Sequence, residues 1–157
     1  MPPSGTPVKE AVLANLETTL AGITAGSDYY TSVARVNRID TVPIELTEYP
    51  AIILVPSGAS YDPPGDATTL AIAVHYRVEA TLVIRARTDA VEKLENFIRD
   101  VHKALLVDIT RGGLAIDTRL TEDRVYYPTD IEEPVAIAEL SIEIHFRTQR
   151  TDLNVAT

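Results

Sequence analysis

One stretch of the sequence, residues 70–87, alternates between apolar and mainly polar positions over its whole length. Alternation with a period of two predicts a strand with one buried and one polar face. The even positions, from Leu70 to Ala86, form the apolar face; the odd positions carry the polar side chains, among them His75, Arg77, Glu79, Arg85 and Arg87. Eighteen extended residues reach about 60 Å, whereas a compact chain of this length is about 40 Å across. We therefore expect the strand to bend, break at a bulge, or project toward a partner.

A second stretch, residues 135–149, alternates in the same way. Its apolar face runs from Ala136 to Phe146, and its other face includes Glu139, Ser141, Glu143, His145 and Arg147. We expect the arginines of the first strand (Arg77, Arg85 and Arg87) to face Glu139 and Glu143, either within one chain or between subunits. Exposed ion pairs contribute under about 1 kcal/mol each, so their expected role is to fix strand register and discourage unwanted edge pairing.

Apolar residues at helical spacing predict two amphipathic helices. The first has Thr6 as N-cap and Pro7 at its first position, and it ends near Gly22–Gly26. The second is capped by Asp89, with Glu92 completing a capping box, and its polar face includes Asp100.

The rest of the chain predicts shorter elements. Residues 29–39 resemble a strand, and the apolar run 51–55 between two prolines is typical of a strand in the middle of a sheet. Residues 57–69 have loop composition, so we expect a loop or arm there. The Gly112–Gly113 pair indicates a turn after the second helix rather than a phosphate-binding loop, and residues 114–120 and 124–127 indicate two short strands. Residues 1–5 and 151–157 are expected to be flexible ends.

These elements predict a single α+β domain over residues 1–157. The expected architecture is a two-layer sandwich, in which a mainly antiparallel sheet with two long strands is covered on one face by two amphipathic helices. The opposite face of the sheet is expected to be polar and charged.

Composition narrows the possible functions. The 157-residue chain has a net charge of −9, which disfavours general binding to nucleic-acid backbones, and no cysteine, which excludes thiol catalysis and disulfides. It contains no apolar run long enough to span a membrane, and its first residues lack the apolar core of a signal peptide, so neither membrane insertion nor export is expected.

Two interpretations of the histidines stay open. His75 and His145 share the polar strand faces with Glu79, Glu139 and Glu143, a residue set that can hold a metal if the two strands pair. Cross-strand ion pairs are favoured, because the ligand spacing is not that of a metal motif and Arg77 and Arg147 place positive charge nearby. We therefore predict no metal and no cofactor. His102 is expected at the surface or the edge of the helix stripe.

The sequence carries no short catalytic motif, and its neighbouring carboxylates, such as Glu132–Glu133, are typical of solvated loops. We therefore predict no catalytic residues and no enzyme activity. Several tyrosines fall in predicted loops and strand ends, where they pack at a domain edge or form a protein interface. The candidate subunit or docking residues are Tyr61, Asp62, Tyr126 and Tyr127. The charged residues of the two long strands belong to the same set: Arg77, Glu79, Arg85, Arg87, Glu139, Glu143 and Arg147.

The layout as a whole resembles the tail terminator (tail completion) proteins of tailed bacteriophages. The resemblance covers residues 7–150 and rests on the order and patterning of the elements. A helix (VKEAVLANLETTLAGI) and a tyrosine-bearing strand (YYTSVARVNRI) are followed by a proline-flanked strand (YPAIILVPSG) and a long strand (LAIAVHYRVEATLVIRAR). A capped helix (TDAVEKLENFIRDVHKALL) and a closing strand (PVAIAELSIEIHFRTQ) complete it.

The resemblance implies a structural subunit of the virion tail or neck, assembled in the host cytoplasm. Such subunits form a hexameric ring that ends polymerisation of the tail tube and docks to the head-side connector. In a contractile tail the ring also touches the sheath, and DNA crosses its lumen without specific binding. A head-completion or connector protein is an alternative. From a different class, a small-ligand-binding or enzymatic domain would use the loops around Tyr61 and Gly112.

A ring also has physical support apart from the resemblance. A strand that outruns its own domain leaves backbone groups that a neighbouring chain can pair with. Head-to-tail contacts between identical chains give a ring when the rotation closes.

Overall fold

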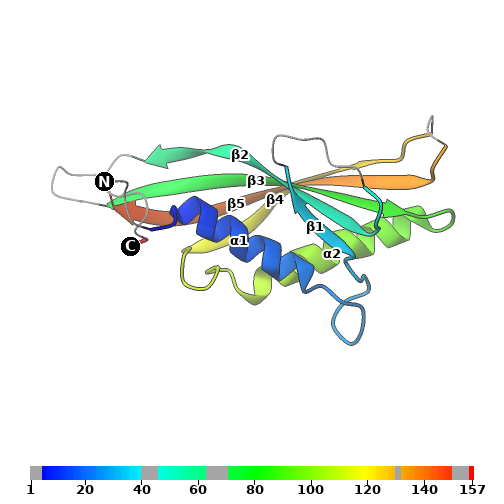
Figure 1. The fold of residues 1–157 in the computed structure, drawn as a ribbon, viewed down its shortest axis with the longest axis horizontal. Helices are drawn as coiled ribbons and strands as arrows, with labels where there is room; N and C mark the ends of the chain where they lie inside the picture. Colours follow the sequence, from blue (N-terminus) through cyan, green and yellow to red (C-terminus); the bar gives the residue numbers. More distant parts are fainter. Residues whose placement is uncertain (1–4, 40–45, 63–70, 130–131, 150–155) are drawn as a thin grey trace.

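The computed structural model describes residues 5–39, 46–62, 71–129, 132–149 and 156–157. Within these residues the chain forms two helices and a five-stranded, mostly antiparallel sheet with the strand order β1-β2-β3-β5-β4. Both helices lie against one face of the sheet, which confirms the predicted α+β two-layer arrangement (Figure 1).

The two long strands form the centre of the sheet. β3 (Ala71–Arg85) and β5 (Val135–Gln149) are each 15 residues long and pair antiparallel without interruption, from Ala71 opposite Gln149 to Arg85 opposite Val135. The pair therefore extends about 50 Å. The predicted long strand is confirmed except at its ends: Leu70 lies outside the described residues, and Arg87 follows the strand. Instead of projecting as an arm, β3 is paired throughout, and the molecule is elongated along it (Figure 1).

β2 (Ala51–Asp62) corrects the prediction of a loop over residues 57–69. Residues 57–62 continue the strand and pair with β3, after a register shift between Pro56 and Gly58. The irregularity accommodates a proline without an N–H group and a glycine at φ 121°, a conformation that other residues rarely adopt. Residues 63–69 of the predicted loop lie outside the described residues. As predicted, the apolar start of β2 is inside the sheet, between β1 and β3.

The outer strands also differ from the predictions. β1 (Arg35–Arg38) is parallel to β2 and shorter than the strand predicted over residues 29–39. β4 (Asp117–Tyr126) is one strand rather than two, with a register shift between Leu120 and Glu122. Thr121 is the extra residue at this shift, and both halves of the strand stay paired with β5.

Helix α1 (Val8–Ala21) begins one residue after Pro7, which takes the N-cap position predicted for Thr6, and ends at the Gly22 cap. Helix α2 (Ala90–Val107) begins after Asp89, but no side-chain cap bond forms there, because Asp89 adopts a left-handed conformation with φ 56°. The predicted capping box is therefore not made. The predicted apolar stripes of both helices pack onto the buried faces of β3 and β5, except Val91, which is exposed.

Two charged residues are buried beside this core. Asp100, predicted on the polar face of α2, is 1% exposed and accepts hydrogen bonds from the backbone N–H groups of Tyr30 and Thr31, at 2.9 and 2.7 Å. Arg111 lies in the turn after α2, where Gly112 and Gly113 have φ of 71° and 83°. These glycine conformations confirm the predicted turn. Residues 156–157, predicted as part of a flexible end, instead lie against β5 through a bridge between Ala156 and Thr148, while residues 151–155 lie outside the described residues.

Candidate functional site

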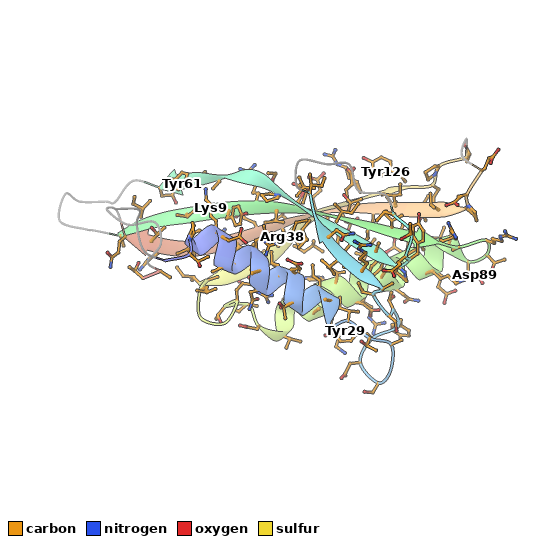
Figure 2. All side chains as sticks on the ribbon, viewed as in Figure 1. Lys9, Tyr29, Arg38, Tyr61, Asp89 and Tyr126 are labelled. Carbon is orange, nitrogen blue, oxygen red and sulfur yellow. The ribbon has the colours of Figure 1, made fainter. Side chains whose placement is uncertain are left out.

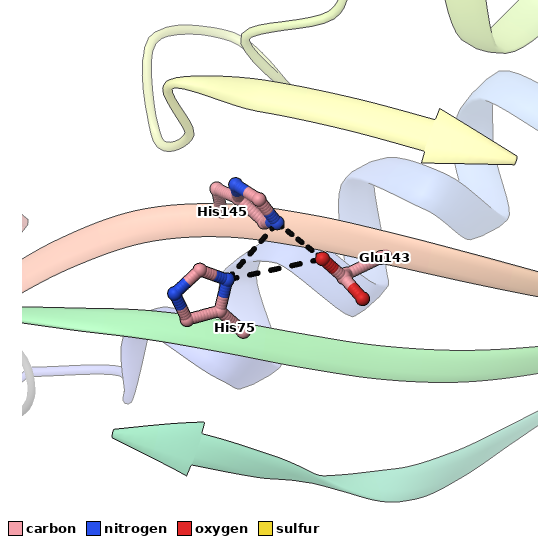
Figure 3. A group of neighbouring side chains, drawn as sticks. All are labelled: His75, Glu143 and His145. Atoms are coloured by element: carbon pink, nitrogen blue, oxygen red, sulfur yellow. Dashed lines mark hydrogen bonds and ion pairs between the residues drawn. The ribbon is translucent and has the colours of Figure 1, made fainter. Parts of the chain in front are cut away.

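The face of the sheet that lies away from the helices is polar, as predicted. Strands β2, β3, β5 and β4 place charged and hydroxyl side chains on this face. On β3 and β5 these are His75, Arg77, Glu79, Thr81, Glu139, Ser141, Glu143, His145 and Arg147. Figure 3 shows part of this surface, with the histidines in front of the strands and α1 behind them.

A hollow of about 400 Å³ opens on this face and is lined by residues of four strands: Val55, Glu79, Thr81, Glu122, Arg124, Glu139 and Ser141. Each of its three carboxylates has a partner. Ser141 Oγ donates to Glu79 at 2.8 Å, Arg124 Nε donates to Glu122 at 2.9 Å, and the Tyr126 hydroxyl donates to Glu139 at 3.2 Å. The carboxylates outnumber the single guanidinium, so the hollow favours cationic or hydrogen-bond-donating groups over phosphates.

Near one end of the same face, β3 and β5 bring together three potential metal ligands. His75 lies directly opposite His145, and Glu143 is two residues before His145 on the same side of β5. His75 Nδ1 is 3.0 Å from His145 Nε2 and 3.8 Å from Glu143 Oε1, and His145 Nε2 contacts that same oxygen (Figure 3). Asp62 of β2 contacts the other nitrogen of His75, Nε2, at 2.7 Å.

The environment favours an ionised Glu143. The hydrogen bond from His145 is the main cause that lowers the pKa of the Glu143 carboxyl, and the charges of His145, His75 and Arg77 add to it against a smaller effect of burial. The cluster therefore holds a carboxylate between two imidazoles, a set of donors suited to a cation.

Only one of the three arginines predicted to face Glu139 or Glu143 lies opposite either of them. Arg77 lies directly opposite Glu143, as expected. Arg85, however, lies opposite Val135 and pairs with Glu133 at 2.6 Å instead of Glu139 or Glu143. The register places Glu139 opposite Thr81, which leaves Glu139 to bond Tyr126. Arg87 is exposed in the turn after β3, and Arg147 is exposed opposite Ala73.

The candidate interface tyrosines lie on two sides of the sheet. Tyr61 is 47% exposed near the end of β2, with its hydroxyl bonded to Lys9 of α1 (Figure 2). Tyr126 and Tyr127 are 43% and 39% exposed at the end of β4. The structure therefore does not join these tyrosines into one site. Tyr61 lines a hollow of about 90 Å³ that does not include Gly112, so the predicted ligand site around both residues has no shared pocket there.

Many of the exposed apolar residues lie near the two ends of β4, which are about 30 Å apart along the strand. Among the described residues, eleven large apolar side chains are exposed, and seven of them come from the segment between the end of α2 and the end of β4. We call these the β4-side patch: Leu106, Val107, Ile109, Ile116, Val125, Tyr126 and Tyr127. Only its two tyrosines were predicted. The exposure of Leu106 and Val107 could have been predicted from the sequence, because both are apolar but lie outside the buried apolar stripe of α2.

Both edges of the sheet are partly open. β4 is the last strand on one side, and on the other side β1 covers only Ala51–Leu54 of β2 among the residues that the structure describes. Each edge carries a register shift, and β4 also carries charged residues. Such features blunt an edge against unlimited backbone pairing. Contacts with another chain are therefore expected to use side chains of limited patches.

Neither helix in the described parts of the chain is long and apolar enough to cross a membrane. Comparison with known proteins finds no family model that matches this chain and no matching curated protein.

Proposed function

We propose that this chain is a structural ring subunit of a phage tail or neck, which caps the tail tube and joins it to the head-side connector. The observation that carries the proposal is the uneven distribution of exposed apolar residues. Exposed apolar surface commonly marks a protein interface. The β4-side patch supplies exposed apolar side chains near both ends of β4, whereas the face of the sheet away from the helices, which we call the open face, is lined mainly by polar and acidic groups.

The opposite edge supplies candidate surface for the next subunit. Ile39, just after β1, is 50% exposed, and Tyr61 of β2 is 47% exposed. A contact between two different sides of identical chains is heterologous, and it closes into a ring if the rotation between subunits permits. The elongated sheet suits this arrangement, because neighbouring subunits can contact one another along its length.

The acidic character of the chain supports a channel that DNA crosses. The hollow on the open face carries Glu79, Glu122 and Glu139 against Arg124, and the whole chain has a net charge of −9. A surface of this sign repels phosphates and does not retain DNA. The proposal therefore assigns the polar face no nucleic-acid binding.

Assembly is tested first by light scattering and negative-stain imaging of the full chain at micromolar concentration. We expect closed rings. Val107→Asp, which places a charge on the most exposed apolar residue of the patch, is expected to give monomers. Val91→Asp is the matched control, because Val91 is 59% exposed near the other end of the same helix and outside the patch.

Three results would contradict the proposed assembly: a wild-type monomer, a two-fold dimer, or rings that persist unchanged in Val107→Asp. The tail role is tested separately in a phage that encodes this chain. Loss of the chain should leave headless tails of uncontrolled length, and supplying Val107→Asp should not restore joining.

A further inference from the structure

We propose that His75, His145 and Glu143 form a binding site for a divalent transition-metal ion, with Zn²⁺ as the best match. The site would join the two central strands on the open face. It goes beyond the proposed function and does not depend on it, because all its ligands come from one chain.

The positions of the three ligand atoms fit such an ion. A tetrahedral Zn²⁺ with bonds of about 2.0–2.1 Å holds neighbouring ligand atoms about 3.3 Å apart. The His75 Nδ1–His145 Nε2 distance is 3.0 Å and the His75 Nδ1–Glu143 Oε1 distance is 3.8 Å, and the three ligand atoms all lie within 4.8 Å of one another. These two distances lie on either side of the spacing that a tetrahedral Zn²⁺ requires.

The hydrogen bond between His75 and Asp62 also orients a lone pair toward the proposed site. His75 Nε2 contacts the Asp62 carboxylate and His145 Nε2 contacts the Glu143 carboxylate, so in the neutral rings both of these nitrogens carry the proton. His75 Nδ1 then presents a lone pair to the cluster. Only the proton on His145 Nε2 lies among the three ligand atoms. A metal ion would take its place when the neutral His145 ring adopts its other tautomer, with the proton on Nδ1 and the lone pair on Nε2.

Asp62 provides the outer support that metal-binding histidines usually have. A histidine ligand commonly donates its second N–H to a carboxylate, which fixes the ring and makes the coordinating nitrogen more basic. Asp62 Oδ2 accepts this hydrogen bond from His75 Nε2 at 2.7 Å. The carboxylate comes from β2, so three adjacent strands contribute to the site.

The exposure of the three ligand side chains and the charges around them indicate a metal site that is open to solvent. The three ligand side chains are between 23% and 30% exposed, so solvent can complete the coordination of the ion. Two imidazoles and one carboxylate with an open position are the ligand set of many zinc sites. Arg77, opposite Glu143, opposes a cation, whereas Asp62 and Glu143 together supply two negative charges.

The test uses the untagged full chain, titrated with ZnCl₂ by calorimetry and followed by the imidazole NMR signals. We expect one Zn²⁺ per chain, with shifts at His75 and His145. Asp62→Asn should weaken binding by about 10–100-fold. His75→Gln, His145→Gln and Glu143→Gln should each weaken it more, and the stabilisation against thermal unfolding that Zn²⁺ gives the wild type should be lost in these three variants.

The sequence offers a matched control, because its only other histidine is His102, which is exposed on α2. His102→Gln should bind Zn²⁺ like the wild type. The absence of binding at millimolar Zn²⁺ would overturn the proposal, as would binding that survives both His75→Gln and His145→Gln. If a ligand variant fails to fold, the wild-type NMR titration still decides: perturbation of His102 without His75 and His145 would reject the site.

Discussion

Asp108 and Arg111 organise the turn that follows α2. Asp108 accepts hydrogen bonds from the Thr110 hydroxyl at 2.6 Å and from the Gly112 N–H at 2.6 Å. The buried Arg111 guanidinium donates to the carbonyl oxygens of Leu105, at 2.7 Å, and Asp108. These bonds satisfy carbonyl groups that the end of a helix otherwise leaves unpaired. Burial lowers the pKa of Arg111, and the negative charge of Asp108 partly offsets this.

The stability of this turn should depend on pH through Asp108. The Thr110 hydroxyl, followed by the Gly112 N–H, lowers the pKa of the Asp108 carboxyl below its ordinary value of about 3.9. The folded state therefore binds this proton less readily than the unfolded state. Its stabilising contribution is present above the ordinary value and is lost as the pH falls through the lower, folded value.

We therefore expect Asp108→Asn to be less stable than the wild type at pH 6 and the difference to shrink toward pH 2.5. Urea unfolding followed by circular dichroism at several pH values measures this. Asp123→Asn, at an exposed position of β4, is the control and should stay within about 0.5 kcal/mol of the wild type. A stability difference for Asp108→Asn that does not change with pH would contradict the assignment.

At the level of single residues, the sequence predicts exposure well only where charge and pattern agree. Arg111 and Asp100 are almost fully buried, although charged side chains are rarely buried in proteins. Their burial depends on groups far along the chain: Asp100 accepts a hydrogen bond from the backbone of Tyr30, and Arg111 also donates to the side chains of Asn15 and Thr19 of α1. No local pattern carries that information.

At the level of elements, β3 and β5 were predictable because alternation is a local property that their whole length shares. The continuation of β2 beyond residue 55 was not predictable, because the sequence Pro56-Ser57-Gly58 is typical of a loop. In the structure a register shift at this point lets the strand continue its pairing with β3. For the candidate site, the period of two places His75 and His145 on polar faces. Their direct opposition depends on the register between strands about 70 residues apart, which the sequence does not reveal.

The central position of β3 gives a sharp test of the sheet. Val78 is fully buried and lies between Pro56 of β2 and Ile142 of β5. Val78→Pro removes an N–H group and constrains the backbone in a strand paired on both sides. We expect a loss of at least about 2 kcal/mol in the free energy of unfolding, or failure to fold.

Urea unfolding and amide hydrogen exchange measure this effect. Val78→Ala is the matched control, because it removes packing but keeps the N–H group, and it should lose less stability than Val78→Pro. If the proline variant were as stable as the alanine variant, β3 would not be an interior strand at this position.

At the scale of the whole molecule, the proposed ring brings acidic chains together through exposed apolar residues. The net charge of −9 opposes association, whereas burial of the β4-side patch favours it. Salt screens the repulsion between exposed charges, with a Debye length that falls from about 10 Å at 0.1 M to about 3 Å at 1 M. Apolar contacts are not weakened by this screening.

We therefore expect the ring to become more stable as NaCl rises from about 0.05 to 0.5 M, because repulsion between the acidic subunits is screened. Sedimentation velocity over a dilution series measures the dissociation at each salt concentration. Val107→Asp should remain monomeric throughout, since its defect is the lost apolar contact together with a buried charge. Rings that dissociate as salt is added would show that ion pairs such as those available to Arg124 and Arg147, rather than the β4-side patch, hold the subunits together.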